Sequence, residues 1–389
     1  MVYPYVIPST TDRSEFDKFF SRRQDDKIMQ AYAENVTKKC IDLVNGEKLN
    51  TIVHWDDTLI YKGQNIRKNT KNHVVKIIGN IKYNIHKIIH KSIQKNKTDS
   101  KSKNNKKVEE KYNRIVALGD IHGDYEHLIK ILRHAKLIDK KKNWIGNDTI
   151  LIQVGDLIDR GNNTLKIYDT MIDLREQAQK KGGIVYMLLG NHELFQLYGN
   201  HIFSSLKDYD SFGGWRGLEE ALGPEGKLGK FIRQEMNVTM VVGDSLFTHG
   251  GLYPEFVEEG VDKINEKARE ILLNTPSIDV LYESYYLKNL THPIMSDPIF
   301  GDTGPLWTRD LVKNPEEEVC SILEKTLELT NTKRMIVGHT VQPFGKIRTR
   351  CDNKLIAIDI GISRCIAGGY YGYLEILNDK KEIWARYLN

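Results

Sequence analysis

From Lys111 to the end of the chain, short apolar runs alternate with longer stretches of helical periodicity. Helical patterns lie near 124–136, 163–181, 254–274 and 315–330. The apolar runs have the length of buried strands and are RIVALG, TILIQVG, IVYMLLG, VTMVVG, SLFTHG, RMIVGH, KLIAIDI, YGYLEIL and EIWARYL. Strand–helix alternation followed by a strand-rich tail predicts an α/β protein with stacked sheets, and roughly 280 residues are ample for a large core.

Five of these runs end in short motifs rich in metal-binding side chains. The motifs are GDIHGD (119–124), GDLIDRG (155–161), GNHE (190–193), HGGL (249–252) and GHT (338–340). Open α/β sheets place their ligands at the carboxyl ends of strands, and a preceding glycine permits the sharp turn that aims a side chain out of the sheet. Each motif alone is a weak signal, but the set at strand-to-loop junctions predicts a metal site.

Together these motifs resemble the PPP family of metallophosphatases, within the calcineurin-like metallophosphoesterase fold. The resemblance covers about residues 112–389 and implies a β-sandwich flanked by helices, with two metals at the sheet edge. Composition and periodicity divide the chain into a helical N-terminal extension (1–61), a basic amphipathic segment with a Lys/Asn-rich linker (62–111) and a catalytic domain (112–389), and the resemblance applies to the last of these. In the first 110 residues we recognise no motif of a known family.

The resemblance also implies a set of metal ligands. Asp120 and His122 would hold the first ion, Asp156 would bridge both, and Asn191, His249 and His339 would complete the second. Carboxylate, imidazole and amide donors suit manganese, iron or zinc rather than calcium. We therefore expect two divalent ions, with manganese as the first choice and iron or zinc as alternatives.

A mechanism follows from this metal site. Two divalent ions lower the pKa of a bridging water, so that hydroxide is available for in-line attack on phosphorus. Arg160 can offer a bidentate fork to the phosphoryl oxygens. His192, oriented by Asp159, would protonate the leaving oxygen. The structural alternative for Asp159 and Arg160 is a surface ion pair.

Departures from the motifs of the wider fold indicate which branch of the family the chain resembles. The GHxH motif of many phosphodiesterases is replaced by Gly338-His339-Thr340-Val341, and no SAPNY segment is present. LLGNHE, GKLGKFIR, GPLWTRD and LIAIDIGIS are similar to the bacterial-like, in particular the Shewanella-like, phosphatases. That similarity implies a second phosphate-binding arginine at Arg309, whose structural alternative is an arginine beside a buried Trp307. Asp359 and Ser363 are candidates for the border of the site.

Three functions are compatible with this site. The first is a phosphomonoesterase that acts on phosphoproteins, at Ser/Thr or Tyr. The second is a hydrolase of nucleoside polyphosphates, similar to the diadenosine tetraphosphatases, or of a capped RNA 5′ end. The third is a catalytically dead phospho-binding scaffold. The presence of all six presumptive ligands and of the His–Asp pair argues against it, because a dead relative would usually have lost one of them.

Positive charge is concentrated in one segment. The formal charge of the chain is +5, but Lys62–Lys111 holds 15 basic and three acidic residues, which leaves 42 basic and 49 acidic residues elsewhere. The apolar stripe of 74–88 predicts an amphipathic helix docked on the parent domain, with an anionic membrane or a partner groove as alternatives. Nucleic-acid binding through 62–111 is not favoured, because aromatic residues are not interleaved with the basic ones.

Cysteine usage and hydropathy bear on the compartment. Cys40, Cys320, Cys351 and Cys365 show no CxxC spacing and predict buried thiols rather than a disulfide framework. With no signal peptide and no run of 18 apolar residues, we expect an intracellular protein, cytoplasmic first, without a transmembrane segment. The oligomeric state does not follow from the sequence.

Overall fold

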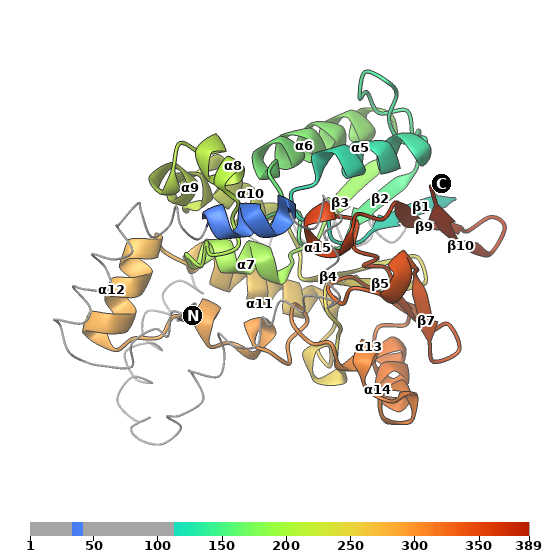
Figure 1. The fold of residues 1–389 in the computed structure, drawn as a ribbon. Coiled ribbons are helices and arrows are strands. Elements are labelled where there is room, and N and C mark those ends of the chain that lie inside the picture. Colours follow the sequence, from blue (N-terminus) through green and yellow to red (C-terminus); the bar gives the residue numbers. More distant parts are fainter. Residues whose placement is uncertain (1–32, 42–112, 389) are drawn as a thin grey trace. The chain divides into compact units, whose positions relative to one another are not determined.

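The computed structural model describes residues 33–41 and 113–388 (Figure 1). All of them belong to one compact unit of the chain, which comprises Thr10–Val53 and Asn113–Asn389. The helix predicted within the first 61 residues is described only at 33–41, where it is helical. The predictions for 62–111 lie outside the described residues, and the division into three domains stays a prediction.

The first sheet contains the three parallel strands that precede the first three motifs. Its order is β10-β9-β1-β2-β3, with β9 antiparallel to β1 and β10 antiparallel to β9. The strands are β1 (Arg114–Leu118), β2 (Ile150–Gln153), β3 (Ile184–Met187), β9 (Gly372–Leu377) and β10 (Glu382–Tyr387). The strand β2 is buried throughout, as expected for a central parallel strand covered on both faces.

The second sheet precedes the other two motifs and has the order β4-β5-β6-β8-β7. Its strands are β4 (Thr239–Val242), β5 (Ser245–Thr248), β6 (Arg334–Val337), β7 (Arg348–Arg350) and β8 (Leu355–Ala357). The central strands β5, β6 and β8 are parallel, and the edge strands are antiparallel to their neighbours.

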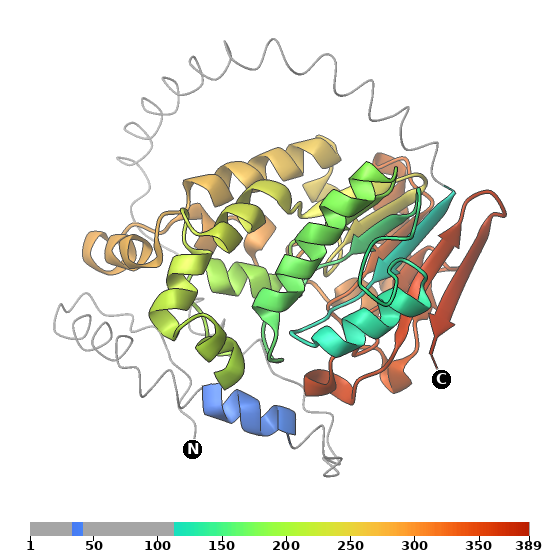
Figure 2. The ribbon, with the colours of Figure 1, turned by 90° about the horizontal axis from the view of Figure 1, so that it is seen from above.

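Helices flank both sheets (Figures 1 and 2). Of the helices on the side of the first sheet, α6 (Thr164–Lys180) contacts β3 and α5 (Tyr125–His134) packs against α6. Contacts to the second sheet come from α11 (Val261–Asn274), α13 (Asp310–Lys313) and α14 (Glu316–Leu329). The prediction of a β-sandwich flanked by helices is confirmed.

Several shorter helices were not predicted. They are α7 (Asn191–Leu197), α8 (Leu206–Ser211), α9 (Trp215–Leu222), α10 (Lys227–Glu235), α12 (Ile278–Lys288) and α15 (Arg364–Ala367). Apart from the 11-residue α12, each spans too few residues to show a sustained period, and α7 begins within a motif that we assigned to a loop. No helix in the described ranges has both the length and the apolar character needed to cross a bilayer.

The expectation of unpaired thiols is wrong. Cys40 is joined to Cys365, and Cys320 to Cys351, across separations of 325 and 31 residues. Sequence spacing does not reveal such pairs, because the fold brings distant positions together. The argument for a reducing compartment therefore loses its basis in the cysteines, and the cytoplasmic location stays a prediction.

The disulfide at Cys40 fastens the helix at 33–41 to the catalytic domain. The backbone N–H of Leu206 donates to Thr37 Oγ1 at 2.9 Å, and Ala33 packs against Tyr209 and Trp215. The N-terminal region is therefore attached to the catalytic domain through at least this helix.

The start of α6 depends on a buried carboxylate from α8. The backbone N–H of Thr164, the first residue of α6, donates to Asp208 at 2.8 Å, and the Thr164 hydroxyl also contacts this carboxylate. Asp208 is 2% exposed. Burial raises the pKa of Asp208 to about 7, although the hydrogen bonds from Thr164 oppose that rise.

We predict that Asp208 makes stability fall as pH rises. The pKa is raised in the folded state, so its contribution is complete below the unfolded pKa of about 3.9 and is lost as pH rises through about 7. Asp208→Asn mimics the protonated form. The free energy of unfolding of the variant minus that of the wild type should therefore increase from pH 5 to pH 8, by roughly 3 kcal/mol at most.

Urea unfolding at the two pH values measures this difference, with Asp148→Asn, at an exposed position, as the matched control. Parallel pH profiles for wild type and Asp208→Asn would contradict the prediction.

Candidate active site

Backbone hydrogen bonds join the GDIHGD loop after β1 to the GDLIDRG loop after β2. The N–H groups of Ile121 and His122 both donate to the carbonyl of Asp156 at 3.0 Å, and the N–H of Gly161 donates to the carbonyl of His122 at 3.1 Å. These bonds fix the two loops as one rigid unit. The first three presumptive ligands, Asp120, His122 and Asp156, are thereby held at one sheet edge.

Backbone carbonyls set the orientation of two imidazoles. His122 Nδ1 lies 3.0 Å from the carbonyl oxygen of Ile158, and His249 Nδ1 lies 2.9 Å from that of Val154. A carbonyl only accepts, so each Nδ1 carries hydrogen and Nε2 is the remaining donor atom for a metal. Both Nε2 atoms face Asp156 Oδ2, at 3.5 Å for His122 and 3.3 Å for His249.

Asn191 and His339 complete the side of the site nearest His249. Asn191 Oδ1 lies 2.9 Å from His249 Nε2, and Asn191 Nδ2 has no hydrogen-bond partner in the described part of the chain. His339 Nε2 contacts the carbonyl of Trp307 at 3.0 Å, which leaves Nδ1 as its ligand atom. An amide oxygen that faces an imidazole lone pair requires positive charge between them, as a proton or a cation.

Buried carboxylates give the site a strong demand for positive charge. Burial raises the pKa of Asp120, and the neighbouring Asp359 and Asp156 raise it further. Burial also raises the pKa of Asp359, to about 6. Burial lowers the pKa of His249, but Asp156 and Asp120 outweigh it and bring it to about 9. A proton on His249 thus occupies the place that a cation would take in the loaded protein.

The residues present fit a metal centre. His122, Asp156 and His192 offer one group of donor atoms, and Asp156, His249 and His339 offer another, each within 4.8 Å. Asp156 belongs to both groups, as a bridging ligand must. Asp120 Oδ2 is 3.8 Å from His122 Nε2, and Asn191 adjoins His249. The structure therefore brings together all six predicted ligands.

The predicted general acid and its partners lie beside this cluster. His192 Nδ1 is 2.7 Å from Asp159 Oδ2, and Arg160 Nη2 is 3.4 Å from His192 Nε2. The Arg160 guanidinium stacks over Phe203, 4.2 Å from the ring centroid. Asp159 and Arg160 are 0% and 2% exposed, which excludes the surface ion pair given as their structural alternative.

Supporting residues that were not predicted hold these groups in place. Glu193 accepts the N–H of Asp156 at 2.9 Å, that of Leu157 at 2.8 Å and that of Gly190 at 2.9 Å. Gln196 and Ser204 donate to Asp159 Oδ1 at 2.6 and 3.1 Å. Glu193 was visible as the last residue of GNHE. Nothing in the sequence marks Gln196 or Ser204.

The remaining candidates also border the site. Arg309 Nη1 donates to the carbonyl of His339. The charge of Arg309, second to burial, lowers the pKa of His339. Ser363 Oγ donates to the carbonyl of His122 at 3.1 Å, and buried Asp359 accepts the N–H of Gly361 at 3.0 Å. Arg309 thus lies at the metal cluster, while its role toward phosphate stays a prediction.

Left-handed backbone occurs at the site residues themselves. The φ angles are +41° at His122, +59° at Asp156 and +61° at His339, where L-residues are strained. The glycines serve close approach between loops, since a Cβ at Gly155 would lie 2.7 Å from His249 Nδ1 and one at Gly190 would clash with Asp156. Our expectation that the glycines supply the turn is thus only part of the explanation.

Comparison with known proteins agrees with this geometry. Residues 113–343 match the family model described as calcineurin-like phosphoesterase. Shewanella-like protein phosphatase 2 of Arabidopsis thaliana is 31% identical over 314 residues, covering 69% of this chain and 76% of that protein. Shewanella-like protein phosphatase 1 of Plasmodium berghei is 34% identical over 288 residues, covering 71% and 75%.

Among solved structures, the cold-active protein-tyrosine phosphatase of a psychrophilic Shewanella species has a TM-score of 0.57 and 26% identity. The structural match covers 70% of this chain and 80% of the Shewanella protein. The sheets, the motif residues and these similarities agree. The chain belongs to the calcineurin-like phosphoesterases, among relatives of the Shewanella-like protein phosphatases, and is a phosphatase of the metal-dependent class.

Proposed function

We propose that the chain is a phosphoprotein phosphatase with two divalent cations. The observation that carries this proposal is the convergence of His122 Nε2 and His249 Nε2 on the buried carboxylate of Asp156. Asp120 and His122 would hold one cation, Asn191, His249 and His339 the other, and Asp156 both. When bound, the cations polarise the phosphoryl group and make hydroxide available for in-line attack. Manganese is our first choice.

The chain's own residues supply the remaining steps. Arg160 binds the phosphoryl oxygens, with Arg309 as a second cationic contact on the opposite side of the cluster. His192 holds a proton for the leaving oxygen, and the Asp159 carboxylate keeps the imidazole in the orientation that presents Nε2. Gln196 and Ser204 fix Asp159 in turn, so that the pair is preorganised.

Phosphoproteins are the substrate class that the relatives favour. Two are named as protein phosphatases, and the solved structure carries the name of a protein-tyrosine phosphatase. Phosphotyrosine and phosphoserine or phosphothreonine peptides are therefore both candidates. Nucleoside polyphosphates and capped RNA remain the alternative, since the metal site alone does not distinguish phosphate esters.

We predict that Asp156→Asn abolishes stoichiometric metal binding. Loss of the bridging charge should reduce the metal content after dialysis from about two ions to one or fewer per chain. Elemental analysis measures this, with the exposed Asp279→Asn as control. Unchanged metal content in a folded Asp156→Asn variant would overturn the assignment of Asp156 as the bridging ligand. Saturating manganese should also raise the unfolding free energy of the wild type, by about 2.7 kcal/mol at one hundred times Kd.

We predict that His192→Ala impairs catalysis in proportion to the basicity of the leaving group. A general acid is worth roughly 10²–10⁴-fold where the leaving alkoxide is poorly stabilised and less where it is a phenolate. Single-turnover rates on phosphoserine peptides should therefore fall more than those on an activated aryl phosphate. His134→Ala, at an exposed position in the last turn of α5, is the matched control. An equal loss on both substrates would remove His192 from the role of acid.

We predict that turnover of at least one phosphopeptide exceeds that of dinucleoside polyphosphate and capped RNA. The comparison uses the manganese-loaded full chain at equal substrate concentrations, with kcat/KM as the measured quantity. A nucleotide substrate faster than both phosphoserine and phosphotyrosine peptides by orders of magnitude would establish the alternative function. If the metal-loaded protein hydrolyses none of these esters, the phospho-binding scaffold is the function that remains.

A further inference from the structure

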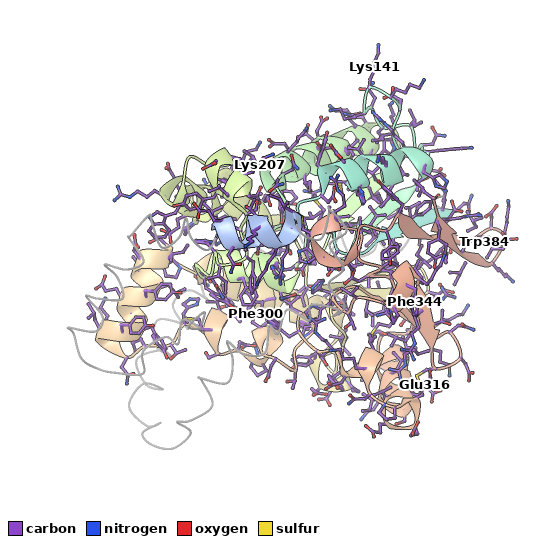
Figure 3. The ribbon with its side chains drawn as sticks, viewed as in Figure 1. Lys141, Lys207, Phe300, Glu316, Phe344 and Trp384 are labelled. Carbon is purple, nitrogen blue, oxygen red and sulfur yellow. A yellow bond between two sulfur atoms is a disulfide. The ribbon has the colours of Figure 1, made fainter. Side chains whose placement is uncertain are left out.

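A cavity of about 500 Å³ lies outside the metal cluster. Its walls come from Tyr125 at the start of α5, the loop at 141–143, Asn162 and Asn163 after the GDLIDRG motif, and one face of α6 from Leu165 to Gln177. Figure 3 labels Lys141, whose side chain extends outward from that loop. None of these residues has a part in the proposed mechanism.

Two lysines of this cavity converge on one aromatic ring. Lys166 Nζ lies 4.1 Å from the Tyr125 ring centroid, and Lys142 Nζ lies 5.7 Å from it. Lys142 Nζ also donates to Tyr125 Oη at 3.2 Å. Burial raises the pKa of Tyr125, but hydrogen bonds from Thr170 and Lys142 and the two ammonium charges lower it below its ordinary value. The local field is therefore positive.

Among the described residues, neither carboxylate on the cavity wall forms an ion pair with these lysines, and the three lysines outnumber the two carboxylates. Asp169 pairs with Lys227 at 2.8 Å, and Asp173 accepts from Gln177 at 2.8 Å. Within the described ranges, no ion pair joins a carboxylate to Lys141, Lys142 or Lys166, the three lysines of the cavity. Three exposed ammonium groups around a hollow favour an anionic ligand.

A buried acceptor in the same wall indicates that the ligand also carries a hydrogen-bond donor. Asn162 Oδ1 is buried and has no hydrogen-bond partner in the part of the chain that the structure describes. Its backbone N–H donates to Gly123 at 3.2 Å, which fixes the residue against the GDIHGD loop. A buried acceptor is costly unless a ligand donates to it, and a peptide N–H is such a donor. Cations beside a side-chain amide acceptor suit an acidic peptide better than a free anion, because the peptide also supplies an N–H donor.

The cavity is close to the reacting groups along both loops. Tyr125 follows His122 by three residues, so their Cα atoms are at most about 11 Å apart, and Asn162 follows Arg160 by two. An extended peptide advances about 3.3–3.6 Å per residue. A substrate with its phosphoryl group at Arg160 would therefore place a residue roughly three to five positions away in the cavity.

We propose that this cavity is a docking subsite for an acidic side chain of the substrate, carboxylate or phosphate, three to five positions from the phosphorylated residue. Lys142 and Lys166, with Lys141 at the rim, bind the anion, and Asn162 accepts a peptide N–H. The subsite makes the enzyme selective for acidic sequences around the phosphorylated residue. This proposal rests on the phosphoprotein function proposed above.

The test compares two phosphopeptides that differ only in glutamate or glutamine at those positions, placed on either side of the phosphorylated residue. The wild type should prefer one of the glutamate peptides in kcat/KM by about 3- to 10-fold, the range expected of two exposed charge pairs. Lys142→Ala/Lys166→Ala should abolish this preference and leave aryl phosphate turnover unchanged. Lys180→Ala/Lys325→Ala removes the same charge from exposed positions outside the cavity and should keep the preference.

A binding measurement separates this proposal from the proposed function. Fluorescence anisotropy of a labelled glutamate phosphopeptide on the inactive Asp156→Asn chain should show weaker binding after the Lys142→Ala/Lys166→Ala change and at higher salt. Equal affinity of both chains, or an unchanged glutamate preference, would overturn the docking subsite. If the wild type hydrolyses aryl phosphate but no phosphopeptide, the phosphoprotein function is contradicted instead. The binding data still decide whether the cavity is a docking subsite.

Discussion

The buried carboxylate of Asp156 is the group on which the rest of the site depends. Its Oδ2 faces two imidazoles, and its Oδ1 accepts the N–H of His192 at 2.9 Å. Its backbone carbonyl holds the GDIHGD loop, and its N–H is held by Glu193. One residue therefore joins loops from three strands of the first sheet to an imidazole from the second. An uncompensated anion at this depth would be costly, so the cationic partners around it are a requirement of the fold as well as of catalysis.

The strands, the longer helices and the ligand motifs are the parts of the structure that local sequence patterns predict. Strands before each motif and the helices at 124–136, 163–181 and 315–330 were recognisable, because each keeps one period over its length. The ligand residues were recognisable by their motifs. The disulfides, the carbonyls that orient His122 and His249, and the convergence of Lys142 and Lys166 on Tyr125 were not. Every residue has a carbonyl, and pairing across the fold leaves no periodic trace.

Charge is distributed differently from what the formal +5 suggests. That value comes from Lys62–Lys111, while the rest of the chain holds more acidic than basic residues and contains every motif. In the catalytic domain the anion-binding capacity comes from a few placed groups. Arg160 and Arg309 lie at the metal cluster, and exposed lysines surround the neighbouring cavity. The docking subsite proposed above for an acidic phosphopeptide rests on these groups, none of which belongs to the basic segment.

The strained backbone connects these features. Asp159 and Arg160 also have φ near +70°, so that the GDLIDRG turn places ligand, orienting carboxylate and arginine in the left-handed region. Each such residue costs on the order of 1 kcal/mol. Glu193 accepts the N–H of Asp156, and Gln196 and Ser204 donate to Asp159; these hydrogen bonds, each worth about 1 kcal/mol or more where a charged group takes part, offset that cost. The same turn continues into Asn162, so the constraint that positions the metal ligands also positions the wall of the cavity. The metal ligand, the orienting carboxylate, Arg160 and the cavity residue Asn162 thus follow one another in a single turn, while Lys142 and Lys166 reach the cavity from the 141–143 loop and from α6.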